Sequence, residues 1–447
     1  MQDDNILKKK AEEPLKISEE LHPKYRGKIE IIPRVPTSRL EYFAIWYTPG
    51  VAAACKKILE NPELSFSFTS RWNTVAVVSD GTRVLGLGNI GPEAGLPVME
   101  GKALLFKYLG GVDAFPLCLK EKDPDRIVEI VKAMEPSFGG INLEDIEKPK
   151  CFYILEKLRN EMSIPVWHDD QQGTATVILA GLINALKIVN KNMGEIKIFI
   201  LGAGAAGVAT LKLLLIAGAK PELIILADRK GTIHPDREDL EEKFGINAEL
   251  LKKTNGEKIK GDYRKAIRGA DVLIALSTPG PGVISKDDVK TMANDPIVFA
   301  CANPVPEIWP WEAREAGAKV VATGRSDFPN QVNNSLVFPG IFRGVLDVSA
   351  KTITDSMCVG VAEEIAKFAE EKGINEEYII PRMDEWELYP KIAARAAHEA
   401  SKEGVARKPL SYEEELKTAT EIILRTRKLQ DFLEQKGIIK NYFHESH

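Results

Sequence analysis

The spacing of apolar positions divides this chain into segments of different structure. From Leu40 to Leu59 apolar residues recur at helical spacing, with a break at Thr48-Pro49-Gly50, where proline removes a donor and glycine frees the backbone. The runs NTVAVVSD and TRVLGLGN predict two strands, and Asp80-Gly81 between them predicts a hairpin or another tight turn. Helices are expected over 98–108 and 124–134, and strands at VDAFPLCL, FGGIN and IPVWHD.

The second half alternates strands and helices more regularly. A long helix over 172–191 precedes the apolar runs EIKIFILG, ELIILAD, DVLIAL, PIVFACAN and AKVVATG. Nearly continuous apolar strands suit a parallel sheet that is covered on both faces. From about Pro339 the chain is mostly helical, and we expect this part to pack back against the first domain. The predicted fold class is α/β, with an extension over 1–36, an α/β domain over 37–171, a Rossmann-like doubly wound domain over 172–400 and a helical segment over 401–447.

Composition narrows the picture only slightly. A length of 447 residues with 44% hydrophobic and 28% charged residues predicts a globular protein of two or three domains. The net charge of -5 gives no reason to expect nucleic acid as a partner. Five scattered cysteines without a Cys-x-x-Cys spacing, no signal peptide and no apolar run long enough for a membrane span predict a cytoplasmic protein.

The clearest motif is a glycine-rich loop between a predicted strand and a predicted helix. Gly202 suits the tight turn, Gly204 a close approach to a pyrophosphate and Gly207 the packing of helix on strand. The next strand ends at Asp228, which suits a ribose hydroxyl but repels a 2′-phosphate, whereas the following Arg229 and Lys230 would neutralise one. NAD and NADP both stay open. The candidate cofactor residues are Gly202, Gly204, Ala205, Ala206, Gly207, Asp228 and Arg229.

Two acidic pairs, Glu144-Asp145 and Asp169-Asp170, each end a predicted strand. Oxygen ligands of this kind suit Mg²⁺ or Mn²⁺, although an acidic pair by itself is usually surface charge. The neighbouring His168 has no partner for a zinc site and is expected to be structural.

Three further residues carry candidate chemistry. Lys102 lies in an apolar helix, where desolvation near a metal would favour the neutral amine that a base requires; the alternative is a lysine that reaches solvent. Tyr47 precedes the helix break and is either aimed into a cleft or an ordinary packed aromatic. Arg83 follows the Asp80-Gly81 turn and suits a substrate carboxylate, unless it is a surface arginine.

Taken together, these strings resemble the malic enzyme family in its smaller prokaryotic form. The similarity runs over about residues 40 to 400 in family order and rests on YTPGVA, SDGTRVLGLGNIGPEAGLPVMEGKALLF, NLEDI, WHDDQQGTA, ILGAGAAG, CANPVPE and NQVNNSLVFPG. The resemblance implies oxidative decarboxylation of L-malate to pyruvate and carbon dioxide, with a divalent metal and reduction of NAD or NADP.

The resemblance also implies roles for individual residues. Lys102 would be the general base with Asp169 tuning it, and Tyr47 the acid that protonates the enol of pyruvate. The implied metal ligands are Glu144, Asp145 and Asp170, and the implied substrate contacts are Arg83, Asn303 and Asn334, with Asn303 also near the nicotinamide. A homodimer or a dimer of dimers is implied, in which the tyrosine-bearing segment completes the neighbouring subunit's site.

Three other functions compete with this interpretation. A malolactic-type enzyme would retain the reduced cofactor and release lactate. An amino-acid dehydrogenase has a similar domain order, but it would leave both acidic pairs without a role. A non-catalytic dinucleotide-binding sensor would leave Tyr47 and Lys102 idle as well.

Overall fold

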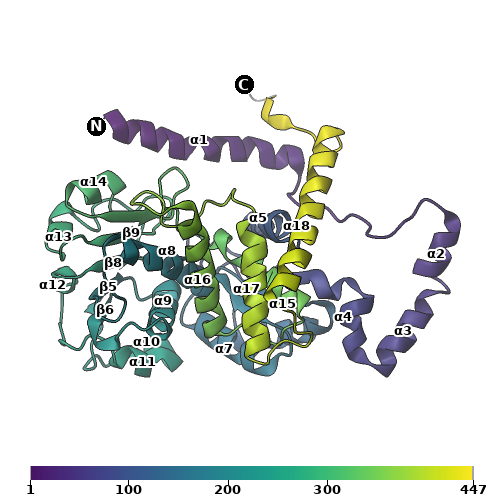
Figure 1. The fold of residues 1–447 in the computed structure, drawn as a ribbon, viewed down its shortest axis with the longest axis horizontal. Coiled ribbons are helices and arrows are strands. Elements are labelled where there is room, and N and C mark those ends of the chain that lie inside the picture. The colour runs from purple at the N-terminus through teal and green to yellow at the C-terminus, as the bar shows by residue number, and fades with distance from the viewer. Residues whose placement is uncertain (1, 445–447) are drawn as a thin grey trace.

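Two largely parallel β-sheets organise the chain, and the computed structural model describes residues 2–444, with side chains from 13 to 443 (Figure 1). The first sheet has four parallel strands in the order β2-β1-β3-β4. Its strands are β1 (Thr74–Ser79), β2 (Asp113–Cys118), β3 (Gly140–Leu143) and β4 (Val166–His168). The helices between them are α5 (Pro92–Gly110), α6 (Pro124–Met134) and α7 (Lys150–Glu161).

The predicted hairpin after β1 is wrong. The run TRVLGLGN forms no strand; instead residues 80–91 make a loop held by an isolated bridge between Val84 and Gly88. The reason lies in the pairing of β1, which has β2 on one side and β3 on the other, both parallel. Both edges of β1 are therefore occupied, and no edge is left for an antiparallel partner.

The second sheet has six strands in the order β10-β9-β8-β5-β6-β7, and only β7 runs antiparallel. Its strands are β5 (Ile198–Leu201), β6 (Ile224–Asp228), β7 (Gly231–Thr232), β8 (Val272–Ala275), β9 (Ile297–Ala300) and β10 (Val320–Thr323). The chain leaves β5 for β6 on one side and later returns to β8 on the other. This topological switch point at the carboxyl ends of β5 and β8 is where doubly wound sheets bind ligands.

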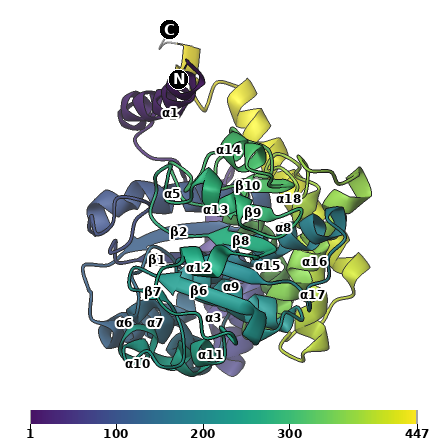
Figure 2. The ribbon, with the colours of Figure 1, turned by 90° about the vertical axis from the view of Figure 1, so that its left-hand side faces the viewer.

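Both faces of this sheet are buried, as the apolar runs predicted. In β5, Ile198 and Ile200 belong to the large hydrophobic core, whereas Phe199 and Leu201 belong to a second core on the opposite face. Helices α8 (Thr174–Ile188), α9 (Ala205–Ile216) and α16 (Asp355–Lys372) pack together beside the large core. Figure 2 shows the six-stranded sheet with its short helices α10 (Leu240–Phe244), α11 (Ala248–Lys252), α12 (Arg264–Ile267), α13 (Lys286–Lys290) and α14 (Pro310–Glu315).

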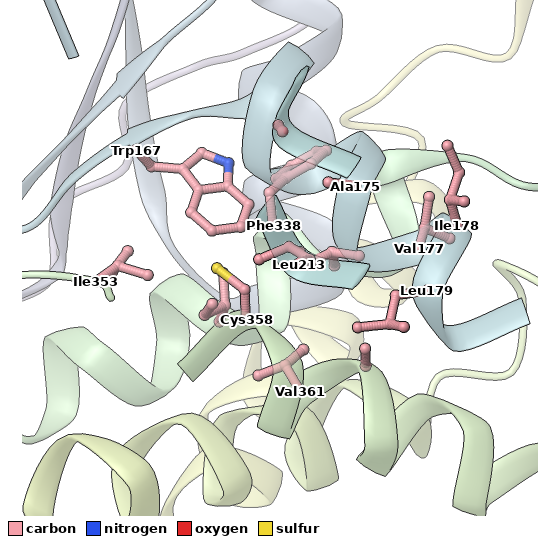
Figure 3. Packing of buried hydrophobic residues seen from close by; sticks show 14 of the residues in the cluster. Trp167, Ala175, Val177, Ile178, Leu179, Leu213, Phe338, Ile353, Cys358 and Val361 are labelled. Atoms are coloured by element: carbon pink, nitrogen blue, oxygen red, sulfur yellow. The ribbon is translucent and has the colours of Figure 1, made fainter. Parts of the chain in front are cut away.

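The C-terminal helices pack back against the first sheet's helix, as expected. Helices α15 (Phe338–Asp347) and α18 (Tyr412–Gln435) both contact α5, and α17 (Leu388–Lys402) lies between them. The large core is therefore shared by elements from distant parts of the chain. Figure 3 shows part of it, in which Trp167, Leu213, Phe338 and Cys358 come from β4, α9, α15 and α16.

The N-terminal part extends away from the two sheets (Figure 1). It contains α1 (Gln2–Tyr25), α2 (Leu40–Trp46) and α3 (Val51–Glu60), and the break between α2 and α3 is the predicted one. Neither α2 nor α3 has a buried residue, although Leu40, Phe43 and Trp46 are large and apolar. No described helix is both long and apolar enough to cross a lipid bilayer.

Candidate active site

The side chain of Lys102 lies at the centre of a buried charge cluster. Helix α5 carries it, and its Nζ lies 2.5 Å from Asp169 Oδ2 and 3.1 Å from Glu144 Oε1. The ring centroid of Phe338 lies 4.4 Å from the same Nζ. Lys102, Glu144 and Asp169 are all less than one tenth exposed. The sequence separates them by up to 67 residues, and the parallel order of β3 and β4 brings them together.

The charge balance around Lys102 differs from the expectation drawn from burial alone. Burial by itself lowers the pKa of the amine, as anticipated. Asp169 and Glu144 outweigh this effect and hold the pKa of Lys102 well above its ordinary value. Asp170 adds a smaller effect of the same sign, so the ammonium form is the stable one beside these carboxylates.

Glu144 also belongs to a group of three carboxylates, with Asp145 and Asp170, next to Lys102. Glu144, Asp145 and Asp170 each place one oxygen so that the three atoms lie within 4.8 Å of one another. The backbone N–H of Asp145 donates to Asp170 Oδ2 at 2.9 Å, and Asp145 Oδ2 is buried without a hydrogen-bond partner among the described residues. Burial and the charge of Asp170 raise the pKa of Asp145 to about 8. Crowded carboxylates with a free buried oxygen fit a hard divalent cation.

Supporting contacts fix the carboxylates in place, and the sequence analysis did not find them. The indole N–H of Trp167 donates to Asp169 Oδ1 at 2.9 Å, and the amide of Asn142 donates to Glu144 Oε2 at 2.9 Å. Asp169 begins a π-helical turn that ends at Gly173, where a Cβ would lie 2.1 Å from Asp169 Oδ1. Gly173 stands in the string WHDDQQGTA, but only the folded turn shows why a side chain is excluded there.

Two of the predicted substrate residues, Arg83 and Asn334, border this cluster, and Asn303 lies beside the loop that carries Arg83. The backbone N–H of Arg83 donates to the carbonyl of Asp145 at 2.9 Å, and its charge opposes the rise in the pKa of Asp145. Asn334 borders the π-helical turn, since its Cβ would lie 3.1 Å from a Cβ at Gly173. Asn303 is exposed just beyond β9, and its carbonyl oxygen would lie 3.3 Å from a Cβ at Gly86, in the loop that carries Arg83.

Tyr47 stands apart from this arrangement, whereas His168 adjoins it, with its Nδ1 3.7 Å from Asp170 Oδ2. Tyr47 is 73% exposed, and its segment between α2 and α3 lies at the outer edge of the chain, away from both sheets (Figure 1). His168 is fully buried, neither ring nitrogen has a hydrogen-bond partner within residues 2–444, and burial lowers its pKa. The neutral, enclosed ring agrees with the structural role expected for His168.

The glycine-rich loop has the geometry of a phosphate cradle between β5 and α9. Gly202 has φ +115°, and a Cβ there would lie 2.3 Å from the carbonyl oxygen of Leu276. A Cβ at Gly207 would lie 2.1 Å from the carbonyl oxygen of Gly202, so helix and strand pack too closely for any side chain. At Gly204 a Cβ would meet nothing within 4 Å, which leaves this backbone open to a ligand. Ala205 and Ala206 form the first turn of α9, where free N–H groups favour phosphate.

Asp228 ends β6 as predicted, but its carboxylate is already bound by cations. Arg237 donates to both of its oxygens at 2.9 Å, and Lys243 donates to Oδ2 at 3.2 Å. The backbone N–H of Lys230 donates to Oδ1 at 2.8 Å. These donors outweigh the effect of burial and lower the pKa of Asp228.

A dinucleotide-type sheet beside a buried lysine and carboxylate cluster defines the class of two-domain, dinucleotide-dependent oxidoreductases. Comparison with known proteins agrees. The family model described as the N-terminal domain of malic enzyme matches residues 26–124 and 120–159, and the model of its NAD binding domain matches residues 171–401. The chain belongs to the malic enzyme family.

Named relatives and solved structures give the degree of similarity. The chain is 52% identical to an NAD-dependent malic enzyme of Geobacillus stearothermophilus over 86% of this chain and 78% of the relative. It is 50% identical to a bifunctional malic/malolactic enzyme of Bacillus subtilis over 88% of this chain and 95% of that one. The crystal structure of Entamoeba histolytica malic enzyme matches with a TM-score of 0.95 and 46% identity, over 100% of this chain and 93% of the other.

Proposed function

We propose that this protein converts L-malate to pyruvate and carbon dioxide while it reduces NAD or NADP, with Mg²⁺ or Mn²⁺ as a required cation. The observation that carries the proposal is the position of Lys102, whose Nζ contacts both Asp169 and Glu144. Glu144 belongs in turn to the carboxylate trio with Asp145 and Asp170. An amine and a cation site therefore meet at one point, as oxidation at a hydroxyl-bearing carbon followed by decarboxylation requires.

The chain's own residues divide the proton transfers between them. Lys102 takes the proton of the C2 hydroxyl in its neutral form, which a divalent cation at Glu144 would favour by offsetting the charge of that carboxylate, and Asp169 orients its amine. Glu144, Asp145 and Asp170 would hold a divalent cation, which would supply polarisation of the C2 oxygen, and a bound nicotinamide would supply the hydride acceptor. Once carbon dioxide has left, Tyr47 donates the proton that C3 of enolpyruvate needs.

Arg83, Asn303 and Asn334 complete the substrate site in this proposal. The guanidinium of Arg83 matches a carboxylate of malate, since a planar fork binds carboxylates through two parallel hydrogen bonds. Asn334 borders the turn that holds Asp169, and Asn303 would contact the nicotinamide half of the cofactor. Asn303 and Arg83 are both exposed, so a substrate can reach them from solvent.

Tyr47 reaches a site only in an assembly. Its exposed position and the uncovered apolar residues of α2 and α3 favour a homodimer, or a dimer of dimers, in which this segment completes the neighbouring subunit's site. Mixing subunits tests this. Each heterodimer of Lys102→Ala and Tyr47→Phe chains would hold one intact site, so random mixing restores about a quarter of wild-type activity. No recovery in confirmed heterodimers would place Tyr47 in its own chain's site.

The decisive assay is absorbance at 340 nm after L-malate is added with Mn²⁺, run with NAD and NADP, with and without EDTA. The proposal predicts a rise that EDTA removes, with pyruvate among the products. The second candidate function is malolactic activity, which is supported by the similarity to a bifunctional malic/malolactic enzyme. Lactate without net reduction would assign that activity instead, and no turnover at all would leave a dinucleotide-binding protein.

The proposal also includes the domain boundaries and the cellular location. We place the substrate and metal domain at 37–171, the dinucleotide domain at 172–400 and the helical segment at 401–447. A cytoplasmic location agrees with five cysteines that are all unpaired in the structure. Limited proteolysis with a protease of broad specificity, with the fragments identified by mass spectrometry, tests the division, since no lysine or arginine lies between Arg159 and Lys187.

A further inference from the structure

The carboxylate at the end of β6 has no capacity left for a ribose hydroxyl. An ionised carboxylate has about four lone-pair sites. Asp228 already accepts four hydrogen bonds, two from Arg237 and one each from Lys243 and the backbone of Lys230. Its side chain is only 9% exposed. The acid that usually selects NAD by accepting from the 2′-hydroxyl is therefore neutralised and covered.

The surroundings of Asp228 carry an excess of positive charge. Asp239 is the second carboxylate of this cluster, and Arg237, Lys230 and Lys243 all contact it. Arg229 follows Asp228 directly and is exposed. A fifth cation, Lys148, approaches from the first sheet and feels the charge of Asp228. Five cationic side chains therefore lie around two carboxylates, and three of the five contact them directly.

Lys148 lies in the loop between β3 and α7, which also carries Glu144 and Asp145. Its Nζ donates to the carbonyl of Ala203, inside the glycine-rich loop, at 2.8 Å, and lies 5.1 Å from the ring centroid of Phe244. Burial lowers the pKa of Lys148; the charge of Asp228 opposes this, while Lys243 and Arg229 add to it. Lys148 has no carboxylate partner among the described residues and is held among like charges, an arrangement that a bound anion relieves.

We infer that this cluster is a binding site for the 2′-phosphate of NADP, and that the enzyme prefers NADP to NAD. Lys148, Arg229 and Lys243 contact the phosphate. Arg237 is a positioning residue, because it neutralises Asp228 and so removes the repulsion that would otherwise exclude the phosphate. The inference rests on the proposed dinucleotide-dependent function and names which of the two cofactors serves it.

Adenosine fragments test this site without any catalysis. Calorimetric titration of the full-length protein with 2′,5′-ADP and with 5′-AMP, in the absence of malate and metal, isolates the contribution of the 2′-phosphate. We expect 2′,5′-ADP to bind at least tenfold more tightly, since a charge-assisted phosphate contact contributes more than a neutral hydrogen bond. Equal affinities, or tighter binding of 5′-AMP, would overturn the inference.

Variants separate the two roles. Lys148→Met should weaken 2′,5′-ADP about tenfold and 5′-AMP less than about twofold; equal losses would place Lys148 at the 5′-phosphate and refute its role here. Arg237→Met should weaken 2′,5′-ADP while 5′-AMP binds equally well or more tightly, because Asp228 regains free acceptor sites. Loss of both ligands together would contradict this positioning role. Lys253→Met, which removes an exposed charge beyond α11, is the matched control and should change neither affinity.

The outcome is distinguishable from failure of the proposed reaction. A protein that prefers 2′,5′-ADP but does not oxidise malate keeps this site and refutes the reaction. A protein that oxidises malate with NAD and binds 5′-AMP more tightly keeps the reaction and refutes the site.

Discussion

The carboxylate trio beside Lys102 and the cationic cluster around Asp228 carry opposite charge, and the pKa of the central carboxylate is shifted in opposite directions in the two. In the first, Glu144, Asp145 and Asp170 crowd together, and the pKa of Asp145 is raised to about 8 by burial and by Asp170. In the second, Asp228 is saturated by donors and its pKa is lowered. Each region holds an excess of one sign of charge, and each therefore favours a ligand of the other sign: a divalent cation in the first and a phosphate in the second.

The largest expected effect on activity comes from removing the amine of Lys102, beside the carboxylate trio. Lys102→Ala should reduce malate oxidation by about 10³-fold or more, because a positioned acid or base contributes up to about 10⁴-fold, while binding of the dinucleotide persists. Steady-state assays together with cofactor titration measure both quantities. Lys107→Ala, five residues further along α5 and outside the cluster, is the control. Retained turnover in Lys102→Ala would refute its role as base.

The next effect comes from the turn that holds Asp169. In Gly173→Ala the new Cβ would fall 2.1 Å from Asp169 Oδ1, so the carboxylate must move and its contact with Lys102 is disturbed. We expect kcat/KM to fall about 10²-fold, as a displacement of about 1 Å can cost, with the affinity for the dinucleotide unchanged. Gly101→Ala is a suitable control, since a Cβ there meets nothing within 4 Å. Near-normal kcat/KM in Gly173→Ala would show that the position of Asp169 matters little.

Cation binding to the trio should be visible in thermal stability. Saturating Mn²⁺ should raise the melting temperature of the wild type by about 5 °C or more, because a ligand at 100 times its Kd stabilises by about 2.7 kcal/mol. In Asp170→Asn the rise should shrink to roughly 1 °C. The neighbouring exposed carboxylate provides the control, Glu147→Gln, in which the full rise should remain. An equal rise in Asp170→Asn would remove Asp170 from the cation site.

The smallest effect concerns a buried carboxylate that belongs to neither region. Glu415 of α18 is fully buried, and burial together with the charge of Asp347 raises its pKa to about 10, with Arg343 opposing. A carboxyl whose folded pKa is raised contributes stability below its unfolded pKa and loses it as pH rises toward 10.

Glu415→Gln should therefore melt a few degrees above the wild type at pH 9 and close to it at pH 5. Thermal melts across this range measure the difference. Glu413→Gln, on the exposed side of the same helix, should show no such divergence. A constant difference at all pH values would mean that Glu415 carries no shifted proton.

The sequence predicted the second sheet well and the surroundings of the site less well. Continuous apolar runs revealed β5, β6, β8, β9 and β10, because burial on both faces leaves little room for polar residues. The loop over 80–91 was mistaken for a strand, since its apolar residues mimic one and strand order cannot be read from a single segment. The candidate residues Lys102, Glu144 and Asp169 were found through motifs, but their supports Trp167 and Asn142 act only through distances that exist after folding.

The cationic cluster around Asp228 could also be predicted only in part from the sequence. Arg229 and Lys230 were visible as neighbours of Asp228, whereas Arg237, Lys243 and Lys148 lie 9, 15 and 80 residues away. No local pattern joins these positions. Only the turn through β7 and the approach of the first sheet's loop place them together.

One short stretch of backbone connects the two regions. Asp145 contributes to the carboxylate trio, and three residues later Lys148 rests on the carbonyl of Ala203 in the glycine-rich loop. A displacement of residues 145–148 would therefore move both a carboxylate of the trio and the contact with the glycine-rich loop. By thermodynamic reciprocity, any factor by which a cation at Asp145 changes the affinity for the dinucleotide is the factor by which the dinucleotide changes the affinity for the cation. The order in which the two ligands arrive then cannot alter the stability of the complete assembly, only the path by which it forms.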